Sequence, residues 1–429
     1  MKIPARLIFL SFLCLYGFRV SGQKDPVKDL GKFSAPLDIN DDSDFTGFHM
    51  LDSVVTRYKV FFTGEFHEMP GNTQIQWKMF SYLHARTGLR TIVFEMPVSY
   101  CFLAQHYLDV NDSNAYFSLV ENSMDFDDRV FFARIFTFNR ELPPGKKIIL
   151  RGIDYEKAFE TSITALKFIS KAHPDLKKKD PLMVRIDKMN YRIRDTALQN
   201  WARKVYWSVA NDTSGYKNVL GNDFQTFRQV IAGIDCDSFV DAETSRRSLD
   251  LRETLLSENF TQLLRDHPRE KIFGQFGETH TCLEPNSNWC QDMNWTSFIA
   301  KANTEKGSPV KDSILIFAYV YANNYYPGQY FPGLSSNDYV ALESQFSWAN
   351  FILFGPIKFA TLEKPLEQKV QYLIFDNFSE KDAEDYYGNE VNDGSQVISN
   401  SGFYCSGFYF SLNAWRHFAI EAGFFSGYE

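Results

Sequence analysis

The chain carries one short pattern twice, in two well-separated segments. Residues 60–68 are VFFTGEFHE and residues 271–280 are KIFGQFGETH, so each copy is an apolar run followed by Gly, Glu, one residue and His. An apolar run that ends in Gly and polar residues is typical of a buried parallel strand, and open sheets bind ligands at the carboxyl ends of such strands. The pattern predicts that the two Glu-x-His groups meet in one pocket, where carboxylate and imidazole suit general-base catalysis or metal binding.

The segment that contains the first copy predicts a βαβ unit. Residues 58–63 have the pattern of a strand, residues 73–86 place apolar side chains at helical spacing, and residues 89–96 form a second apolar run that Pro97 stops. Such units favour a parallel sheet. Further strands are expected before Gly277 and at residues 147–154, 313–320 and 370–376.

From about residue 156 to residue 267 the sequence is helical in pattern and more charged, without a convincing strand. We interpret this segment as a helical insertion in one elaborated α/β domain that spans residues 23–429. The insertion is expected to form a lid or flank at the carboxyl edge of the sheet. The expected fold is therefore α/β, with a mainly parallel central sheet flanked by helices.

Residues 1–22 predict a cleaved secretory signal peptide. Lys2 and Arg6 precede an apolar stretch at residues 7–18, and small residues follow up to Gly22. This is the usual layout of a signal peptide, and the stretch is too short for a good membrane-spanning helix. We expect a secreted or periplasmic protein without membrane attachment after cleavage; a retained N-terminal anchor is the alternative.

Composition narrows the classes of partner. The net charge of −8 argues against nucleic acid and anionic membrane surfaces, while 41 Phe and 22 Tyr suit aromatic-lined clefts for a small-molecule ligand. Beyond the predicted signal peptide there are five cysteines, of which Cys282 and Cys290 are the best candidates for a short disulfide-closed loop. The others are Cys101, Cys236 and Cys405.

Polar side chains follow four of the expected strands. They are Glu65 with His67, Glu95, Arg151 with Asp154, and Glu278 with His280. A carboxylate buried after an apolar run is costly unless it is paired, and Arg151 is the expected partner of Glu95. That pair could hold the sheet together or belong to the site, and the sequence leaves both interpretations open.

These residues can be assigned roles in a hydrolytic site. His67 would be the general base, oriented by Glu65 or Glu95, and His280 with Arg151 would stabilise the oxyanion. The sequence has no Gly-x-Ser-x-Gly elbow, which disfavours a serine hydrolase of that type.

Three further residues are expected to contact substrate: Glu68, Asp154 and Glu278. No residue is assigned as a metal ligand and no cofactor is required for the hydrolytic interpretation. The same two histidines and carboxylates could nevertheless hold a divalent metal ion with open positions.

The segments TGEFHEMP, RTIVFEMP, LRGID and GETH resemble the erythromycin esterase, ChaN-like and TIKI superfamily. The resemblance covers roughly residues 54–154 and 271–282. Two departures matter. The esterases typically have Gly-Glu-x-x-His at the first site, whereas Glu65 and His67 are one residue closer, as in the ChaN-like form. The esterases also have two histidines three apart at the second site, where Gly277 replaces the first.

The resemblance implies a scaffold and a pocket, but the departures mean that the macrolide reaction does not transfer. The leading hypothesis is a secreted or periplasmic, erythromycin-esterase-like hydrolase of an ester, lactone or amide, acting through His67 and His280. The alternatives are a ChaN-like haem (porphyrin) binding protein, a TIKI-type metal-dependent peptidase, and a scaffold that has lost its chemistry.

Overall fold

The structure is a computed structural model of the chain. It describes residues 34–39, 41–65, 67, 72–123, 126–157, 159–189, 196–237, 246–283, 296–311, 313–321, 324–327, 339–342, 351–353 and 370–375. The expected signal peptide at residues 1–22, Glu68 and Cys290 lie outside these residues, so what was expected of them stays a prediction.

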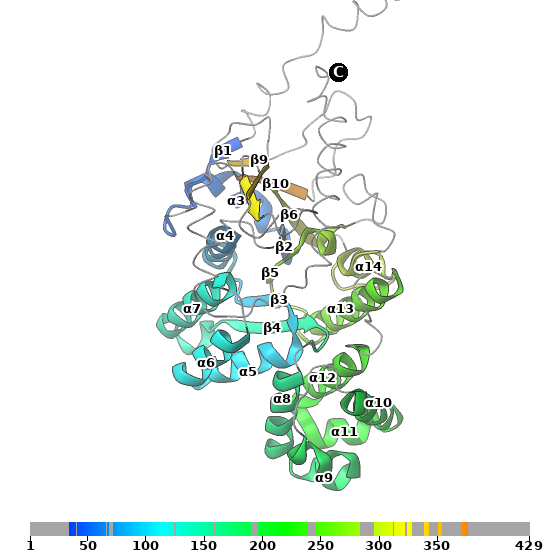
Figure 1. The fold of residues 1–429 in the computed structure, drawn as a ribbon. Coiled ribbons are helices and arrows are strands. Elements are labelled where there is room, and N and C mark those ends of the chain that lie inside the picture. Colours follow the sequence, from blue (N-terminus) through cyan, green and yellow to red (C-terminus); the bar gives the residue numbers. More distant parts are fainter. Residues whose placement is uncertain are drawn as a thin grey trace, which may run out of the picture.

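An eight-stranded sheet in the order β1-β9-β10-β6-β2-β5-β3-β4 forms the centre of the molecule (Figure 1). Strands β6, β2, β5, β3 and β4 are all parallel, β10 continues parallel to β6, and β9 and β1 add antiparallel pairs at that end. This confirms the predicted α/β fold with a mainly parallel sheet. The strands are β1 (Ser34–Pro36), β2 (Val60–Glu65), β3 (Thr91–Pro97), β4 (Ile149–Asp154), β5 (Ile272–Gly277), β6 (Ile314–Tyr321), β9 (Phe351–Leu353) and β10 (Val370–Phe375).

A separate antiparallel pair consists of β7 (Asn324–Pro327) and β8 (Tyr339–Leu342). The helices that flank the sheet are α3 (Asp52–Val55), α4 (Asn72–Thr87), α5 (Val98–Asp109), α6 (Ser113–Ser123), α7 (Phe126–Glu141), α8 (Phe159–Ala172), α9 (Asp175–Lys179), α10 (Thr196–Asn211), α11 (Thr213–Leu220), α12 (Phe224–Asp237), α13 (Arg246–Asp266) and α14 (Phe298–Thr304). Short 3-10 helices are η2 (Thr46–Leu51), η3 (Pro144–Lys146), η4 (Pro181–Lys188), η5 (Gly221–Asp223) and η6 (Glu278–Thr281). Within the described part of the chain, every helix is too short or too polar to cross a membrane.

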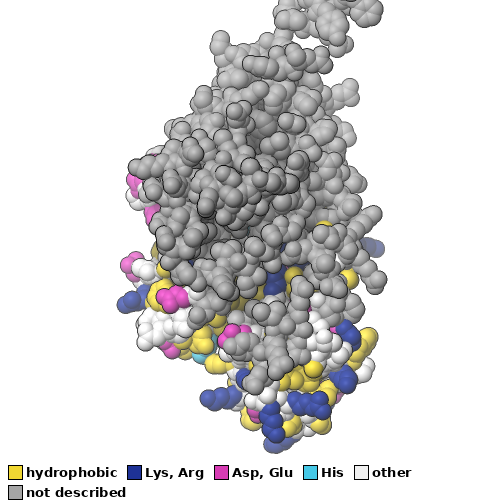
Figure 2. Space-filling model, viewed as in Figure 1, with side chains coloured by type: hydrophobic (Ala, Val, Ile, Leu, Met, Phe, Trp, Pro, Cys, Tyr) yellow, Lys and Arg dark blue, Asp and Glu magenta, His cyan; other side chains and the backbone are white. Residues whose placement is uncertain are grey.

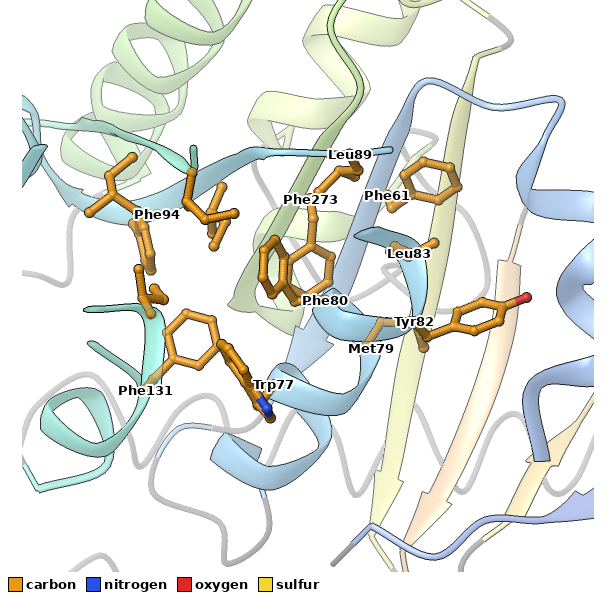
Figure 3. Packing of buried hydrophobic residues seen from close by; sticks show 14 of the residues in the cluster. Phe61, Trp77, Met79, Phe80, Tyr82, Leu83, Leu89, Phe94, Phe131 and Phe273 are labelled. Carbon is orange, nitrogen blue, oxygen red and sulfur yellow. The ribbon is translucent and has the colours of Figure 1, made fainter. Parts of the chain in front are cut away.

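Successive side chains along a strand point to opposite faces of the sheet, and both faces are buried. In β2, Phe61 joins the hydrophobic core that includes α4 and α7, whereas Phe62 joins the core under α13 and α14. Figure 3 shows the first core, where Phe80 of α4 packs against Phe273 of β5 with ring centroids 6.2 Å apart. Continuous apolar runs such as VFF are what a strand buried on both faces requires.

The described residues between β4 and β5 form helices without strands. Helices α8 to α12 share a hydrophobic core of their own, and they lie beside edge strand β4 (Figure 1). That core meets α5 through Val98, and α13 then leads back over the sheet, where Leu256 and Phe260 pack in the same core as Phe62. Whether the segment acts as a lid stays a prediction.

Lysines at the end of α9 form a basic patch at the lower end of the face in Figure 2. Each of residues 177–179 pairs with an aspartate, in turn Asp187, Asp175 and Asp212. Exposed ion pairs of this kind contribute little stability, and here they occupy the positive charges. The patch is therefore a solvated network of ion pairs.

The cysteines separate into two classes. Cys282 is disulfide-bonded, whereas Cys101 and Cys236 are free thiols and so are not its partner. The predicted partner, Cys290, lies outside the described residues. A disulfide-bonded sulfur has no thiolate to offer, so Cys282 does not serve as a nucleophile in this state.

Candidate functional site

The carboxyl ends of four neighbouring strands bring together the polar groups that the sequence singled out. Glu65 is the last residue of β2, Asp154 is the last of β4, and His280 lies in η6 directly after β5. Glu95 lies near the end of β3, where the pairing with β4 shifts register between Phe94 and Pro97. The parallel order β2-β5-β3-β4 places these ends along one edge of the sheet.

His67 lies just beyond β2 and contacts two carboxylates. Its Nδ1 is 3.0 Å from Glu65 Oε1, and its Nε2 is 4.0 Å from Glu95 Oε2. The side chain is 32% exposed, so solvent reaches the imidazole. Burial disfavours the charged imidazole, but the hydrogen bond that His67 donates to Glu65 and the negative charge of Glu95 outweigh it and raise the pKa of His67 above 6.5.

His280 has a different environment because it is almost fully buried, with 1% of its side chain exposed. Its Nε2 lies 3.2 Å from Glu95 Oε1, and its Nδ1 lies 2.5 Å from Glu253 Oε1 on α13. Burial alone would lower its pKa, but the charges of Glu253 and Glu95 raise the pKa of His280 to about 9. His280 is therefore an imidazolium at neutral pH.

Gly277 lies between the two histidines. A Cβ atom added at this glycine would be 2.8 Å from His67 Nε2 and 3.5 Å from His280 Cδ2. Both imidazoles thus approach one point at the end of β5, and a side chain at this position would displace the His67 ring. The glycine that replaces the first histidine of the esterase pattern leaves the room that His67 occupies.

Arg252 of α13 is the buried cation of the site. Its Nη2 is 2.6 Å from Glu95 Oε1 and 2.7 Å from Asp154 Oδ2, and its Nε donates to Asp154 Oδ1 at 3.0 Å. Its Nη1 also lies 3.4 Å from His280 Nε2. A single guanidinium on α13 therefore joins the ends of β3 and β4.

The buried charges keep both carboxylates of this network ionised. Burial favours neutral Glu95, but the charges of His280 and Arg252 hold the pKa of Glu95 well below 4.5. Burial likewise opposes ionisation of Asp154, and Arg252 and Lys157 lower the pKa of Asp154 to about 2. Glu95 also accepts a hydrogen bond from the Gly277 N–H at 2.9 Å.

The sequence-based pairing of Glu95 with Arg151 was wrong. Glu95 pairs with Arg252, whereas the Arg151 side chain donates to the carbonyl of Leu150 at 3.0 Å. The register partner of Arg151 is Val93, two residues before Glu95, so Arg151 lies about 7 Å back from that position along the strand. Arg151 is therefore not placed to stabilise an oxyanion beside His67.

Two residues expected to contact substrate are buried. Asp154 is fully buried and engaged by Arg252 and Lys157, so its role in the structure is to hold the cation. Glu278 is 5% exposed and its Oε2 has no hydrogen-bond partner among the described residues. Burial raises the pKa of Glu278 to about 8, so it is a neutral carboxylic acid at neutral pH.

Sequence reasoning missed Arg252 and Glu253 of α13 and Gln275 of β5. Gln275 donates to Glu65 Oε2 and accepts from Thr63 Oγ1 at 3.2 Å, which fixes the carboxylate behind His67. A signal for Arg252 was present, because it precedes Leu256 by four residues on the apolar face of a helix. A charged residue on such a face needs a buried partner.

The described residues do not assemble a metal site. They contain no group of three or more His, Cys, Asp or Glu side chains that could hold a metal ion. The divalent-metal alternative therefore lacks a fitting ligand set in the part of the chain that the structure describes.

No family model and no curated protein matches the chain, but solved structures share its fold. One is a succinoglycan biosynthesis protein, with a TM-score of 0.60 and 12% identity over 83% of this chain and 98% of that one. Another is a Bacillus cereus protein, structural-genomics target BcR135, with a TM-score of 0.59 and 12% identity over 82% and 96%. A third is an erythromycin esterase mutant, EreC, in its open conformation, with a TM-score of 0.55 and 13% identity over 80% and 96%. The chain has an erythromycin-esterase-like fold, as the sequence resemblance predicted.

Replacing Arg252 by Met tests the ion network. The change leaves Asp154 and Glu95 buried without their cation, so we expect the free energy of unfolding to fall by about 3–5 kcal/mol. Arg265→Met is the matched control on the same helix, because Arg265 is 53% exposed and pairs with Glu305 at 3.4 Å. The control should lose less than about 1 kcal/mol in the same denaturant titration. Equal losses in both variants would contradict the network.

Glu278→Gln tests the buried neutral acid. The pKa of Glu278 is about 8 in the folded protein against 4.5 ordinarily, so the folded state retains a proton that the unfolded chain releases between these pH values. The wild type therefore loses stability as the pH rises from 4.5 to 8, and the glutamine variant lacks this loss. In denaturant titrations between pH 4.5 and 8, the free energy of unfolding of the variant should rise relative to that of the wild type. Glu160→Gln, on the exposed side of α8, is the control, and its free energy of unfolding should depend on pH as that of the wild type does.

Proposed function

We propose that the chain is a hydrolase of an ester, lactone or amide in which His67 takes a proton from the attacking water. The observation that carries the proposal is the contact of His67 Nδ1 with Glu65 Oε1 at 3.0 Å. A carboxylate at Nδ1 holds the proton there, so the neutral ring carries its lone pair on Nε2. That tautomer and the partial exposure of the ring are what a general base requires.

The charges around His67 support this role. Glu65 and Glu95 are negative and lie on either side of the ring, so they stabilise the imidazolium that forms when His67 accepts a proton. Glu65 is fixed in turn by Gln275. Gln275 thus holds Glu65, and Glu65 holds the His67 ring in one orientation during the proton transfer.

His280 acts as a positioning residue in this proposal. Both of its nitrogens lie against carboxylates, at Glu253 and Glu95, so its positive charge serves to hold Glu95 ionised and in place. We therefore do not propose that His280 and Arg151 stabilise an oxyanion directly. Arg252 and His280 instead supply the buried positive charge that balances Glu95.

The fold supports the class of reaction. One structure with this fold is an erythromycin esterase, which gives an ester or lactone bond as the first substrate class to test. At 13% identity the macrolide itself does not carry over. Neither haem binding nor a metal-dependent peptidase activity is favoured by an observation on the described residues.

His67→Ala tests the proposal. We expect the purified protein to hydrolyse members of a panel of p-nitrophenyl esters, γ- and δ-lactones and anilides. The variant should lose about a hundred-fold or more in kcat/KM, the usual size of a lost general base, while its melting temperature stays unchanged. His49→Ala, at an exposed histidine in η2, is the control and should keep full activity. Full activity in His67→Ala would remove the proposed base.

The pH dependence gives the same experiment a second readout. His67 must be neutral to accept a proton, and its pKa is raised above 6.5, so activity should fall on the acid side with an apparent pKa above 6.5. Glu65→Gln removes the negative charge that accepts a hydrogen bond from His67 and raises its pKa. The acid limb of the pH–activity profile should therefore move to lower pH. An acid limb that stays in place or moves to higher pH would contradict the assignment of His67.

A further inference from the structure

A cavity of about 820 Å³ lies along edge strand β4, and none of the residues around His67 lines it. Its walls come from α5, β4, the segment from η5 into α12, and the later turns of α13, which border β4 in Figure 1. Arg151 is one lining residue, and apolar lining is supplied by Phe102, Phe224 and Leu263. The lining is therefore mixed, with a guanidinium among aromatic and aliphatic side chains.

The cavity exists because β4 has no further strand beside it in the described sheet. Side chains satisfy the backbone groups that such a strand would pair. Gln105 accepts from the Leu150 N–H at 2.6 Å, and Asn259 donates to the Ile153 carbonyl at 2.9 Å. These two hydrogen bonds prevent another strand from pairing with β4. The cavity lies beside this edge, next to Arg151.

Arg151 lacks an anionic partner in the described structure. Its guanidinium donates to the carbonyl of Leu150. The charges of Glu270 and Asp109 act on it, but among the described residues neither forms an ion pair with it. Burial lowers the pKa of Arg151 and outweighs the charges of Glu270 and Asp109, which act in the opposite direction. Arg252, by contrast, has two carboxylates within 3.0 Å. A guanidinium that is partly withdrawn from water without an anion is a site that an anion would stabilise.

The carboxylates that also line the cavity are engaged elsewhere. Asp109 accepts from Gln105 at 2.7 Å, Asp223 pairs with His173 at 2.8 Å, and Asp266 accepts from Gln262 at 2.9 Å. His173 pairs with Asp223, whereas Asp109 and Asp266 accept only from neutral amides and stay negative. An anion is therefore favoured at Arg151, whose forked donors match the two oxygens of a carboxylate or phosphate group.

We propose that this cavity binds a small organic anion, with a carboxylate or phosphate group on Arg151 and an apolar or aromatic body against Phe102, Phe224 and Leu263. The volume suits one small molecule, since ligand pockets are commonly about 300–1,000 Å³. The site is separate from the proposed hydrolytic site, and binding here requires no activity at His67. Its failure and the failure of the proposed hydrolase are therefore distinguishable.

Calorimetric titrations of the full chain test the proposal with three probes: phenyl phosphate, benzoate and inorganic phosphate. We expect saturable one-to-one binding of phenyl phosphate or benzoate, at least about tenfold tighter than inorganic phosphate because the ring adds apolar contact. Absence of saturable binding by both aromatic anions, or binding no tighter than that of inorganic phosphate, would overturn the proposal.

Arg151→Met identifies the anchoring residue. Binding of the aromatic anions should weaken at least about tenfold, while the melting temperature without ligand stays equal or rises, because an uncompensated charge has been removed. Arg57→Met, at an exposed arginine before β2, is the control and should bind as the wild type does. A lower melting temperature together with unchanged affinity would show that Arg151 is only structural and would overturn the assignment.

Arg151→Lys keeps the proposal testable if the methionine variant does not fold. Lysine retains the charge but loses the forked pair of donors, so affinity for phenyl phosphate should fall while some binding persists. Unchanged affinity for phenyl phosphate in this variant would contradict a bidentate contact between Arg151 and the anion.

Discussion

The buried guanidinium of Arg252 is the interaction on which the arrangement of the site depends. It contacts Glu95 at 2.6 Å and Asp154 at 2.7 Å, and so ties a helix to the carboxyl ends of β3 and β4. Three charged groups buried together are costly unless each is satisfied, and here each finds a partner of opposite sign. The geometry of the strand ends therefore follows from an electrostatic requirement as well as from packing.

The same network gives the two histidines opposite characters. His280 is enclosed by Glu253 and Glu95 and stays charged, whereas His67 is partly exposed and contacts Glu65 at the outer side of the cluster. Glu95 lies between the two rings and faces both. A fixed imidazolium inside and a titrating imidazole outside are the division that a general base with a preorganised environment needs.

Six strands of the sheet, their parallel direction and the approach of His67 and His280 could be predicted, because apolar runs and strand-end polar residues are local signals. The strand order and the short strands β1, β7, β8 and β9 were not predicted. Arg252 could not be paired in the same way, since it reaches Glu95 from a helix far away in the sequence and the contact depends on how α13 crosses the sheet. Arg151 was misplaced because its position along β4, level with Val93, was not considered. Gly277 was noticed as a departure from the esterase pattern, and only its distance to His67 explains it.

Side-chain ¹⁵N NMR of the histidines across a pH titration measures the protonation of both rings, with His67→Ala and His280→Gln used to assign the two signals. We expect His280 to remain doubly protonated at neutral pH and to titrate near 9, and His67 to titrate separately, above 6.5. A neutral His280 at pH 7, or a His67 that titrates below 6.5, would contradict the charge arrangement from which the proposed base is argued.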